Sequence, residues 1–267
     1  MNQSSKYALK PLVKEQIVDS LSNTAKTNLS ELIVLSETDS TNGFLLNHQA
    51  NKSKARVCVT ESQNAGRGRH GNEWLSAPNQ NIMMSLSWGF PNDAKEISSL
   101  SLAVAVVVAE RLNMNFDLGV KIKWPNDLLV DDNKLAGILI ETNTSNENLL
   151  NVVVGLGLNV SQPNWSRQDA DYDWCDLAGL NVDVDRNQLI ADIASDLIML
   201  LRQFEQTGFA PLATRWNEMS SYTEREIIIG EQHGILKGVD DQGALLLLNQ
   251  HNELIKITDS RLSVRLI

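Results

Sequence analysis

The chain has 267 residues, of which 42% are hydrophobic, and a formal charge of -10 that comes from 23 lysines and arginines against 33 aspartates and glutamates. A chain of this length buries one substantial core and leaves residues for a small second domain, while the acidic balance repels polyanions and argues against nucleic-acid binding. No uninterrupted apolar run approaches the roughly 20 residues of a membrane-spanning helix, and the first residues lack the basic-then-apolar order of a secretion signal, so we expect a cytoplasmic protein without membrane association.

Hydrophobic periodicity predicts both helices and strands in the first third of the chain. Residues 82–88 alternate apolar and polar side chains, which indicates a half-buried strand. The two cysteines, Cys58 and Cys175, have no partners at metal-ligand spacing, so we expect free thiols. The expected elements in chain order are a helix over 11–21, a strand over 32–35, a helical turn over 43–46 with its N-cap among 39–42, a strand over 56–60 and the strand over 82–88.

The rest of the chain predicts more strands and a smaller second domain. Residues 98–112 are rich in valine, yet about fifteen residues is long for a strand, so we expect a buried helix. The elements expected after it are strands ending near 124, over 135–141 and over 149–160, helices over 185–206 and 209–219, and short strands over 226–229, 234–239, 244–248, 254–257 and 262–266. The fold class is therefore α+β: a mixed, largely antiparallel sheet packed with helices in residues 1–220, and a small β-barrel in residues 221–267.

The stretch from 63 to 71, with sequence QNAGRGRHG, is the most informative part of the chain. Its glycines allow the backbone to approach an oxyanion, and its arginines supply forked donors that match phosphate. The spacing satisfies the dinucleotide fingerprint G-x-G-x-x-G, but the loop-like residues 72–80 replace the helix that this fold requires. A phosphate-binding loop is the simpler interpretation, with a solvated basic loop as the alternative for this stretch alone. The glycines are Gly66, Gly68 and Gly71, and the arginines are Arg67 and Arg69.

Three further segments place polar residues or glycines beside predicted strands. Residues 123–127 (KWPND) put a cation, an aromatic ring and a carboxylate close together, with Pro125 fixing the backbone between them. Lys134 begins a strand in which Gly137 lets another group pass close to the backbone. Residues 155–159 (GLGLN) end the next strand. Each segment alone is compatible with an ordinary strand end or a surface lysine.

Taken in order with residues 40–42, these segments resemble the motifs of biotin protein ligases from about residue 33 to the end of the chain. Residues 238–246 also resemble the SH3-like domain that closes those enzymes. The resemblance implies an enzyme that joins biotin to ATP as biotinyl-5'-AMP and transfers biotin to one lysine of a biotin carboxyl carrier protein. It implies biotin and ATP as substrates and Mg²⁺ as a required ion, without a tightly bound prosthetic group.

The resemblance also assigns a biotin pocket and a catalytic lysine. The family loop that matches 63–74 folds over the adenylate, which implies that Arg69 holds the phosphate with Arg67 beside it. Lys134 is implied to reach the biotin carboxylate and the same phosphate, while Gly137 leaves room for the ring system. The implied biotin-binding residues are Ser40, Thr41, Asn42, Gln63, Gly66, Arg67, Gly68, Arg69, Lys134, Gly137, Gly155 and Gly157.

The nucleotide is assigned to residues on both domains. Asn159 and Trp74 are expected to border the adenine end, and Arg265 to approach ATP from the terminal domain. Asp127 matches a family carboxylate linked either to Mg²⁺ or to the incoming lysine, so it is predicted to be catalytic together with Arg69 and Lys134. The implied residues of the ATP and adenylate site are Arg67, Arg69, Trp74, Lys123, Asn126, Lys134, Asn159 and Arg265.

Two positions depart from the family loop, which commonly has arginine where this chain has His70 and Asn72. The loop is therefore less cationic than usual. Since positive charge retains the adenylate, we expect biotinyl-adenylate to leak faster.

Two other functions fit parts of the sequence. Lipoate and octanoate ligases or transferases share the fold type and the Lys-x-x-Gly element of Lys134 and Gly137, but they lack the paired-arginine loop. A biotin-responsive transcriptional regulator would need an N-terminal winged helix, and only about thirty residues without a basic recognition helix precede the match, so we expect the monofunctional form. The sequence leaves the choice between monomer and homodimer open.

Overall fold

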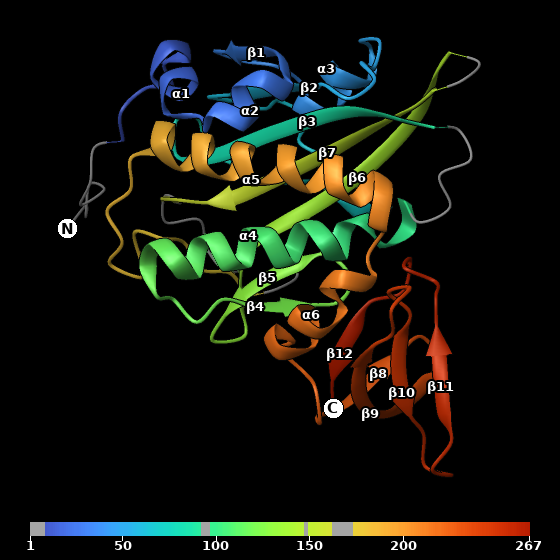
Figure 1. Cartoon of the computed structure of the whole chain (residues 1–267). Helices are drawn as coiled ribbons and strands as arrows, with labels where there is room; N and C mark the ends of the chain where they lie inside the picture. The colour runs from blue at the N-terminus through green and yellow to red at the C-terminus, as the bar shows by residue number, and fades with distance from the viewer. Residues whose placement is uncertain (1–8, 92–96, 147–148, 162–172) are drawn as a thin grey trace, which may run out of the picture.

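The computed structural model describes residues 9–91, 97–146, 149–161 and 173–267. Its larger sheet has seven strands in the order β1-β2-β3-β7-β6-β5-β4 (Figure 1). The pair β1–β2 is parallel and the other pairs are antiparallel, which confirms the predicted mixed, largely antiparallel sheet. The strands are β1 (Leu29–Leu35), β2 (Ala55–Thr60), β3 (Asn81–Pro91), β4 (Lys121–Lys123), β5 (Asp127–Val130), β6 (Asn133–Asn146) and β7 (Leu149–Asn159).

Two long helices, α4 and α5, lie next to each other across one face of this sheet (Figure 1). Asp185 begins α5 as predicted, because its carboxylate accepts hydrogen bonds from the first backbone N–H groups of the helix. The described α-helices are α1 (Lys14–Ser20), α2 (Asn23–Asn28), α3 (Thr41–Leu46), α4 (Leu100–Phe116), α5 (Arg186–Thr207) and α6 (Ala213–Met219), with short 3₁₀ helices at Arg69–Gly71, Ile97–Ser99 and Ala210–Leu212.

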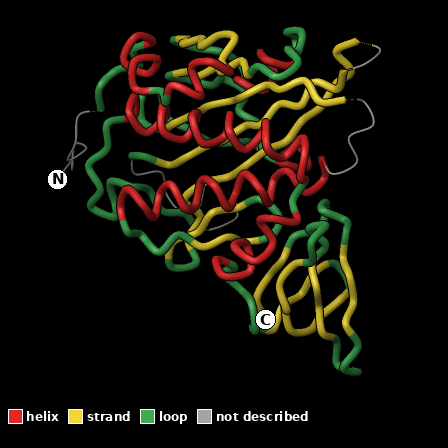
Figure 2. Tube along the Cα trace, in the orientation of Figure 1, coloured by secondary structure: helices red, strands yellow, loops and turns green. Residues whose placement is uncertain are grey.

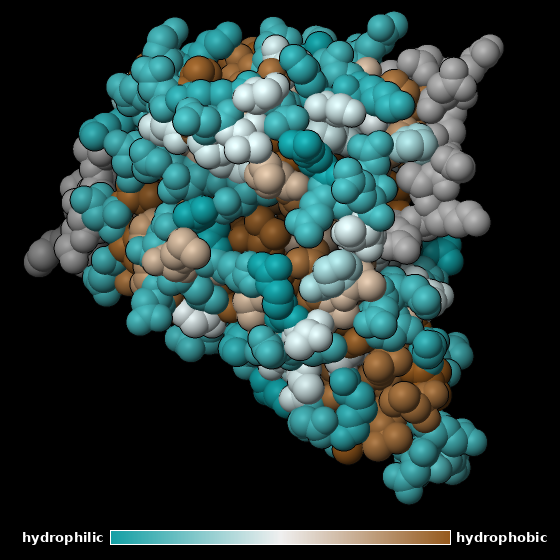
Figure 3. All heavy atoms as spheres, viewed as in Figure 1, coloured by the Kyte–Doolittle hydropathy of each residue, from teal (hydrophilic) through white to brown (hydrophobic). Residues whose placement is uncertain are grey.

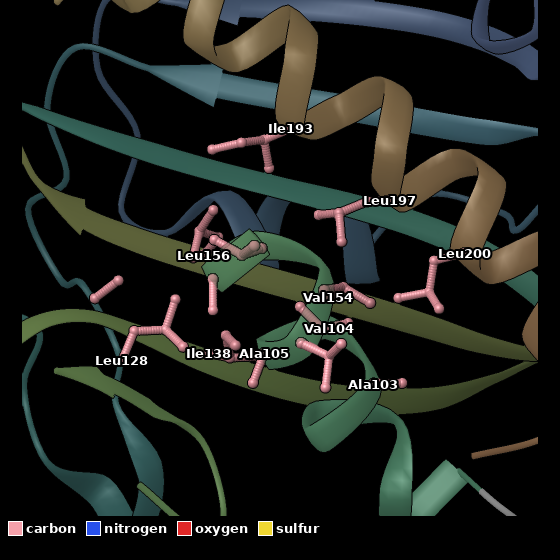
Figure 4. Close-up of a cluster of buried hydrophobic side chains, with 14 of the residues drawn as sticks. Ala103, Val104, Ala105, Leu128, Ile138, Val154, Leu156, Ile193, Leu197 and Leu200 are labelled. Atoms are coloured by element: carbon pink, nitrogen blue, oxygen red, sulfur yellow. The ribbon is translucent and has the colours of Figure 1, made fainter. Parts of the chain in front are cut away.

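The main core fills the space between these two helices and the sheet. Val104 of α4, Leu197 of α5 and Leu156 of β7 point into that space (Figure 4), and all three are buried. Burying such a side chain contributes roughly 1.5–3 kcal/mol. Helix α4 is apolar around most of its circumference because it packs against α5, α6 and the sheet at once.

Helix α4 also explains an apparent membrane signal in the sequence. By length and composition, Ile97–Phe116 would be long and apolar enough to cross a membrane. More than half of its most apolar window is buried inside the protein, at 56%. A central core helix is therefore sufficient to account for this composition.

The opposite face of the sheet carries helix α3. Ser40 is its N-cap, as predicted, and the Ser40 hydroxyl accepts a hydrogen bond from the backbone N–H of Gly43 at 3.4 Å. Leu45 of α3 is buried with Cys58 of β2 and Val153 of β7 in a small separate cluster. The cap and this cluster together fix residues 40–42 against the sheet.

The five strands of the second sheet lie in the order β11-β10-β9-β8-β12, and every described pair is antiparallel. This arrangement is consistent with the predicted SH3-like fold. The sheet follows α6 at one end of the larger domain (Figure 2), and apolar residues gather on its outer surface (Figure 3). Its strands are β8 (Glu226–Ile229), β9 (Gln232–Val239), β10 (Leu245–Leu248), β11 (Leu254–Ile257) and β12 (Val264–Leu266).

Hydrogen bonds connect the end of β4 to segments that flank the second sheet. The Trp124 indole Nε1 donates to the carbonyl of Gly243 at 3.3 Å. The backbone N–H of Ser221 donates to the carbonyl of Ile122 at 2.9 Å. The turn that begins with Lys123 is thus supported from the small domain.

Three predictions of local structure were wrong. Strand β3, expected to be half-buried, is buried on both faces along Asn81–Phe90, because helices cover one face while α3 and the loop after β2 cover the other. Between residue 120 and α5, the described residues form four strands instead of three, since the short β5 lies between two turns and shows no alternation. Near the N-terminus, α2 was missed, and β1 begins at Leu29 instead of residue 32.

Both cysteines are free thiols, as predicted. Burial raises the pKa of Cys58 to about 12 and the pKa of Cys175 to about 11. Because the thiolate is the reactive form, both side chains are weak nucleophiles near neutral pH.

Candidate active site

A cavity of about 470 Å³ lies on the face of the large sheet that is turned away from α4 and α5. Val154 and Leu156 of β7 point toward those helices (Figure 4). Successive side chains of a strand alternate between faces, so Gly155 and Gly157 face the cavity, which they line. Two glycines in the centre of a sheet leave space above the backbone.

Asn42 occupies the space above Gly155. A Cβ atom at Gly155 would collide with the Asn42 side chain. The Asn42 Oδ1 atom accepts a hydrogen bond from the Ser85 hydroxyl at 2.6 Å, and its Nδ2 atom donates to the carbonyl of Leu139 at 3.3 Å. Asn42 is only 4% exposed, so these bonds fix the orientation of its amide.

Trp74 occupies the space above the next pair of glycines. Gly137 of β6 and Gly157 of β7 are directly paired. A Cβ atom at Gly157 would collide with the Trp74 indole, and one at Gly137 would lie 3.1 Å from it. The Lys134 Nζ atom lies 5.6 Å from the centre of the indole ring, a cation–π distance. The glycines thus seat an aromatic side chain that comes from the glycine-rich loop.

Neutral polar groups connect the start of α3 to the loop after β2. The Gln63 Oε1 atom accepts hydrogen bonds from the backbone N–H of Thr41 at 2.8 Å and from its hydroxyl at 3.1 Å. The Ser85 hydroxyl lies 2.7 Å from the Thr41 hydroxyl. Such a group of uncharged donors and acceptors suits an uncharged polar ligand.

Two cations from distant segments meet at the turn between β4 and β5. Lys134 Nζ forms an ion pair with Asp127 Oδ1 at 2.8 Å, and the Arg69 Nη1 atom donates to Asn126 Oδ1 at 2.9 Å. Both cations line the cavity. Burial lowers the pKa of Arg69, although the nearby Asp127 opposes this effect, and an arginine remains protonated in proteins. The cavity wall therefore carries two cations, one paired with Asp127 and one bonded to its neighbour Asn126.

Arg67 has a different partner from Arg69. Its Nη2 atom pairs with Glu141 Oε2 at 3.1 Å, and a Cβ atom at Gly43 would lie 3.4 Å from the same guanidinium nitrogen. The resemblance implies that Arg69 holds the phosphate with Arg67 beside it. In the structure their side chains separate, because Glu141 holds one and Asn126 holds the other.

The small domain supplies part of the cavity wall through residues 263–265, next to Tyr222. Lys123 Nζ lies 6.0 Å from the centre of the Tyr222 ring. Burial lowers the pKa of Lys123, the nearby carboxylate of Asp127 opposes this effect, and the cation of Lys134 adds to it. Asp127 thus offsets part of the effect of burial on Lys123.

Most of the predicted site residues line this one cavity. They are Ser40, Thr41, Asn42, Gln63, Arg67, Gly68, Arg69, Trp74, Lys123, Asn126, Asp127, Lys134, Gly137, Gly155, Gly157 and Arg265. Two predicted residues, Gly66 and Asn159, are not among the described residues that line the cavity. The Gly66 carbonyl accepts from the backbone N–H of Trp74 at 2.9 Å, and Asn159 Nδ2 donates to the carbonyls of Lys134 at 3.3 Å and Cys175 at 3.1 Å. The Gly66 carbonyl and the Asn159 side chain thus stabilise the backbone of neighbouring segments.

Sequence reasoning missed several polar residues of this region. Ser85, Tyr222 and Asp173 contact or line the cavity, but only the strand register and the packing of the chain bring them there. Glu141 could have been found, because it follows Gly137 at the period of two that puts alternate strand residues on one face.

Comparisons with known proteins identify the relatives of this chain. Residues 34–159 match the biotin/lipoate A/B protein ligase family. The bifunctional ligase/repressor BirA of Escherichia coli is 36% identical over 218 residues, covering 80% of this chain and 68% of that protein. The biotin–[acetyl-CoA-carboxylase] ligase of Paracoccus denitrificans is 30% identical over 223 residues, covering 80% of this chain and 92% of that protein. A biotin protein ligase from Aquifex aeolicus, solved with biotin and ATP, has a TM-score of 0.76 at 25% identity and covers 90% of this chain and 100% of its own.

Proposed function

The chain belongs to the biotin protein ligase family, and we propose that its cavity forms biotinyl-5'-AMP from biotin and ATP. The observation that supports this assignment best is the meeting of Arg69 and Lys134 in one cavity whose other end is neutral and polar. A neutral pocket suits the ureido ring of biotin, and two cations suit the anion formed where its carboxylate meets the nucleotide.

In the first reaction, a biotin carboxylate oxygen bonds to the α-phosphorus of ATP and the bond to the pyrophosphate oxygen breaks. Negative charge develops on the α-phosphoryl oxygens in that step. We assign Arg69 and Lys134 to this charge, since fixed donors in a partly dry site stabilise it more than water does. Trp74, seated on Gly137 and Gly157, would limit water access to the anhydride.

Mg²⁺ fits this site as an ion that arrives with ATP. No group of three metal-binding side chains occurs among the described residues, but Mg²⁺ at nucleotides needs only one or two carboxylates beside the phosphates. Asp127 would provide one. The ion would offset charge on the phosphate oxygens of ATP.

In the second reaction, the neutral amine of an acceptor lysine attacks the carbonyl carbon of the mixed anhydride, and AMP leaves. The acceptor lysine must first lose a proton, because its ordinary pKa is about 10.4. We assign the proton to Asp127, the carboxylate beside Lys134. The acceptor is a carrier protein of a carboxylase, and the biotin carboxyl carrier domain is our specific proposal. A homodimer and a cytoplasmic location stay predictions.

ATP–pyrophosphate exchange measured with biotin, lipoate and octanoate in parallel tests the substrate class. We expect exchange with biotin and background rates with lipoate and octanoate, since neither acid has a ureido group to match the polar pocket around Thr41 and Gln63. Exchange with lipoate or octanoate and not with biotin would contradict this assignment and indicate a lipoate or octanoate ligase.

Retention of the adenylate is expected to be weaker than in relatives that have arginine at positions 70 and 72. The measurement is the half-life of biotinyl-adenylate on the wild-type enzyme and on the double variant His70→Arg, Asn72→Arg. We expect an increase of about three- to tenfold in the double variant, the effect of added partly exposed charges. An unchanged half-life would show that these two positions do not control leakage.

A further inference from the structure

Glu141 lies just outside the main cavity and is not part of the site assigned above. It is on β6, four residues after Gly137, and alternation therefore directs it to the same face of the sheet. Its side chain is 25% exposed. It lines a second, more open hollow together with Leu139 and the glycine-rich loop.

One oxygen of Glu141 contacts two different parts of the site. Its Oε2 atom accepts from Asn42 Nδ2 at 2.8 Å and from Arg67 Nη2 at 3.1 Å. Asn42 belongs to α3 at the floor of the cavity, whereas Arg67 belongs to the loop that covers it. A single carboxylate thus connects the floor with the loop.

The contact with Asn42 adds a third bond to the two that already fix its amide, and it is the shorter of the two bonds from Nδ2. Asn42 Oδ1 already accepts from the Ser85 hydroxyl at 2.6 Å. If the amide were flipped, its oxygen would face the Glu141 carboxylate, and two acceptors without a proton between them repel each other. Together with Ser85 and the Leu139 carbonyl, Glu141 therefore stabilises the pattern of donors and acceptors at the neutral end of the cavity.

The contact with Arg67 offsets a positive charge next to that neutral end. Arg67 lines the cavity and is 44% exposed in its side chain. Without Glu141, this cation would have no described carboxylate partner and would be free to turn toward the phosphate region. The ion pair with Glu141 holds the Arg67 guanidinium, and therefore the glycine-rich loop, next to α3.

From these contacts we infer that Glu141 is a positioning residue for biotin, which ties the glycine-rich loop to Asn42 and so preforms the pocket for an uncharged ring. The inference rests on the proposed function. It predicts an effect on biotin binding and on loop retention of the adenylate, and little effect on the chemical step once both substrates are bound.

The test compares Glu141→Gln with the wild-type enzyme. Glutamine keeps the shape and can still accept from Asn42, but it loses the ion pair with Arg67. We expect the KM for biotin in pyrophosphate exchange to rise about fivefold with kcat within about twofold, since one charge-assisted hydrogen bond is weakened. Calorimetry with biotin alone should show the same loss of affinity. Glu141→Leu, which removes both contacts, should show a larger rise.

Glu31→Gln is the matched control, because Glu31 forms a similar ion pair with Arg56 at 3.0 Å on the outer strands and does not line the cavity. Its KM should stay at the wild-type value. In the double variant with Arg67→Met, the effect of Glu141→Gln should shrink, since contacting residues are not additive.

An unchanged KM in both Glu141 variants would overturn the inference, as would a fall in kcat and thermal stability with KM unchanged, which indicates a merely structural residue. Absence of biotin binding and exchange in the wild-type enzyme would overturn the proposed function, and the inference with it. Activity in the wild type with unaffected variants would overturn the inference alone.

Discussion

Replacing Lys134 with methionine is expected to reduce biotin-dependent ATP–pyrophosphate exchange by about 10²- to 10³-fold, the loss measured when one fixed donor to a developing oxyanion is removed. The Lys134 ammonium is held by Asp127 at 2.8 Å and lies over the Trp74 ring. Methionine keeps the unbranched shape but not the charge. The substitution also leaves Asp127 as an unpaired carboxylate that repels the incoming phosphates.

The same variant needs a control for charge and one for folding. Lys134→Arg keeps the charge but changes its geometry, and should recover only part of the activity. Lys121→Met removes an exposed lysine on β4 that does not line the cavity and should leave exchange unchanged. If Lys134→Met kept exchange within tenfold of wild type with normal thermal unfolding, Lys134 would not carry the role assigned to it.

Replacing Arg69 with glycine is expected to turn a selective enzyme into one that releases its intermediate. The Arg69 guanidinium bonds to Asn126 at the cavity wall, where it can hold both the phosphate and the loop. Loss of a charged hydrogen bond corresponds to about a 10- to 100-fold faster release of biotinyl-adenylate. The free anhydride then reacts with exposed lysines of any protein.

Two measurements follow this release: the half-life of bound biotinyl-adenylate, and biotin incorporated into a protein without an acceptor site, such as serum albumin. Arg69→Ala separates the guanidinium from the backbone, because glycine also loosens the loop. Equal release from both variants would assign the effect to the lost charge. Unchanged half-life and selectivity in Arg69→Gly would contradict the role of Arg69.

The segments that form the site could be predicted from the sequence because the residue types within each segment indicate its chemistry. The paired arginines near Gly68, the cation and carboxylate of residues 123–127, and the glycines of residues 155–159 each have a recognisable composition. Their meeting at one cavity depends on the antiparallel pairing of β6 with β7 and with β5. That pairing could be expected from the alternation of strands, although the short β5 was missed.

The contacts within the site were not predictable in the same way. Nothing local in residues 155–159 shows that Gly155 makes room for Asn42 and Gly157 for Trp74, since those partners come from segments far away in the chain. The serines of β3 misled for a similar reason. The alternation of Ser85 and Ser87 with apolar residues predicts a strand face exposed to solvent. Both serines are buried instead, and Ser85 is hydrogen-bonded to Asn42.

The indole of Trp124 bonds to the carbonyl of Gly243, directly after Lys123 in the chain, while residues 263–265 complete the wall on the same side. Replacing the five-stranded sheet with that of a relative is therefore expected to alter the cavity wall. A foreign sheet would have to reproduce both the carbonyl under Trp124 and the cation at Arg265. Gly243, which does not line the cavity, thus supports the wall of the cavity through its bond to Trp124.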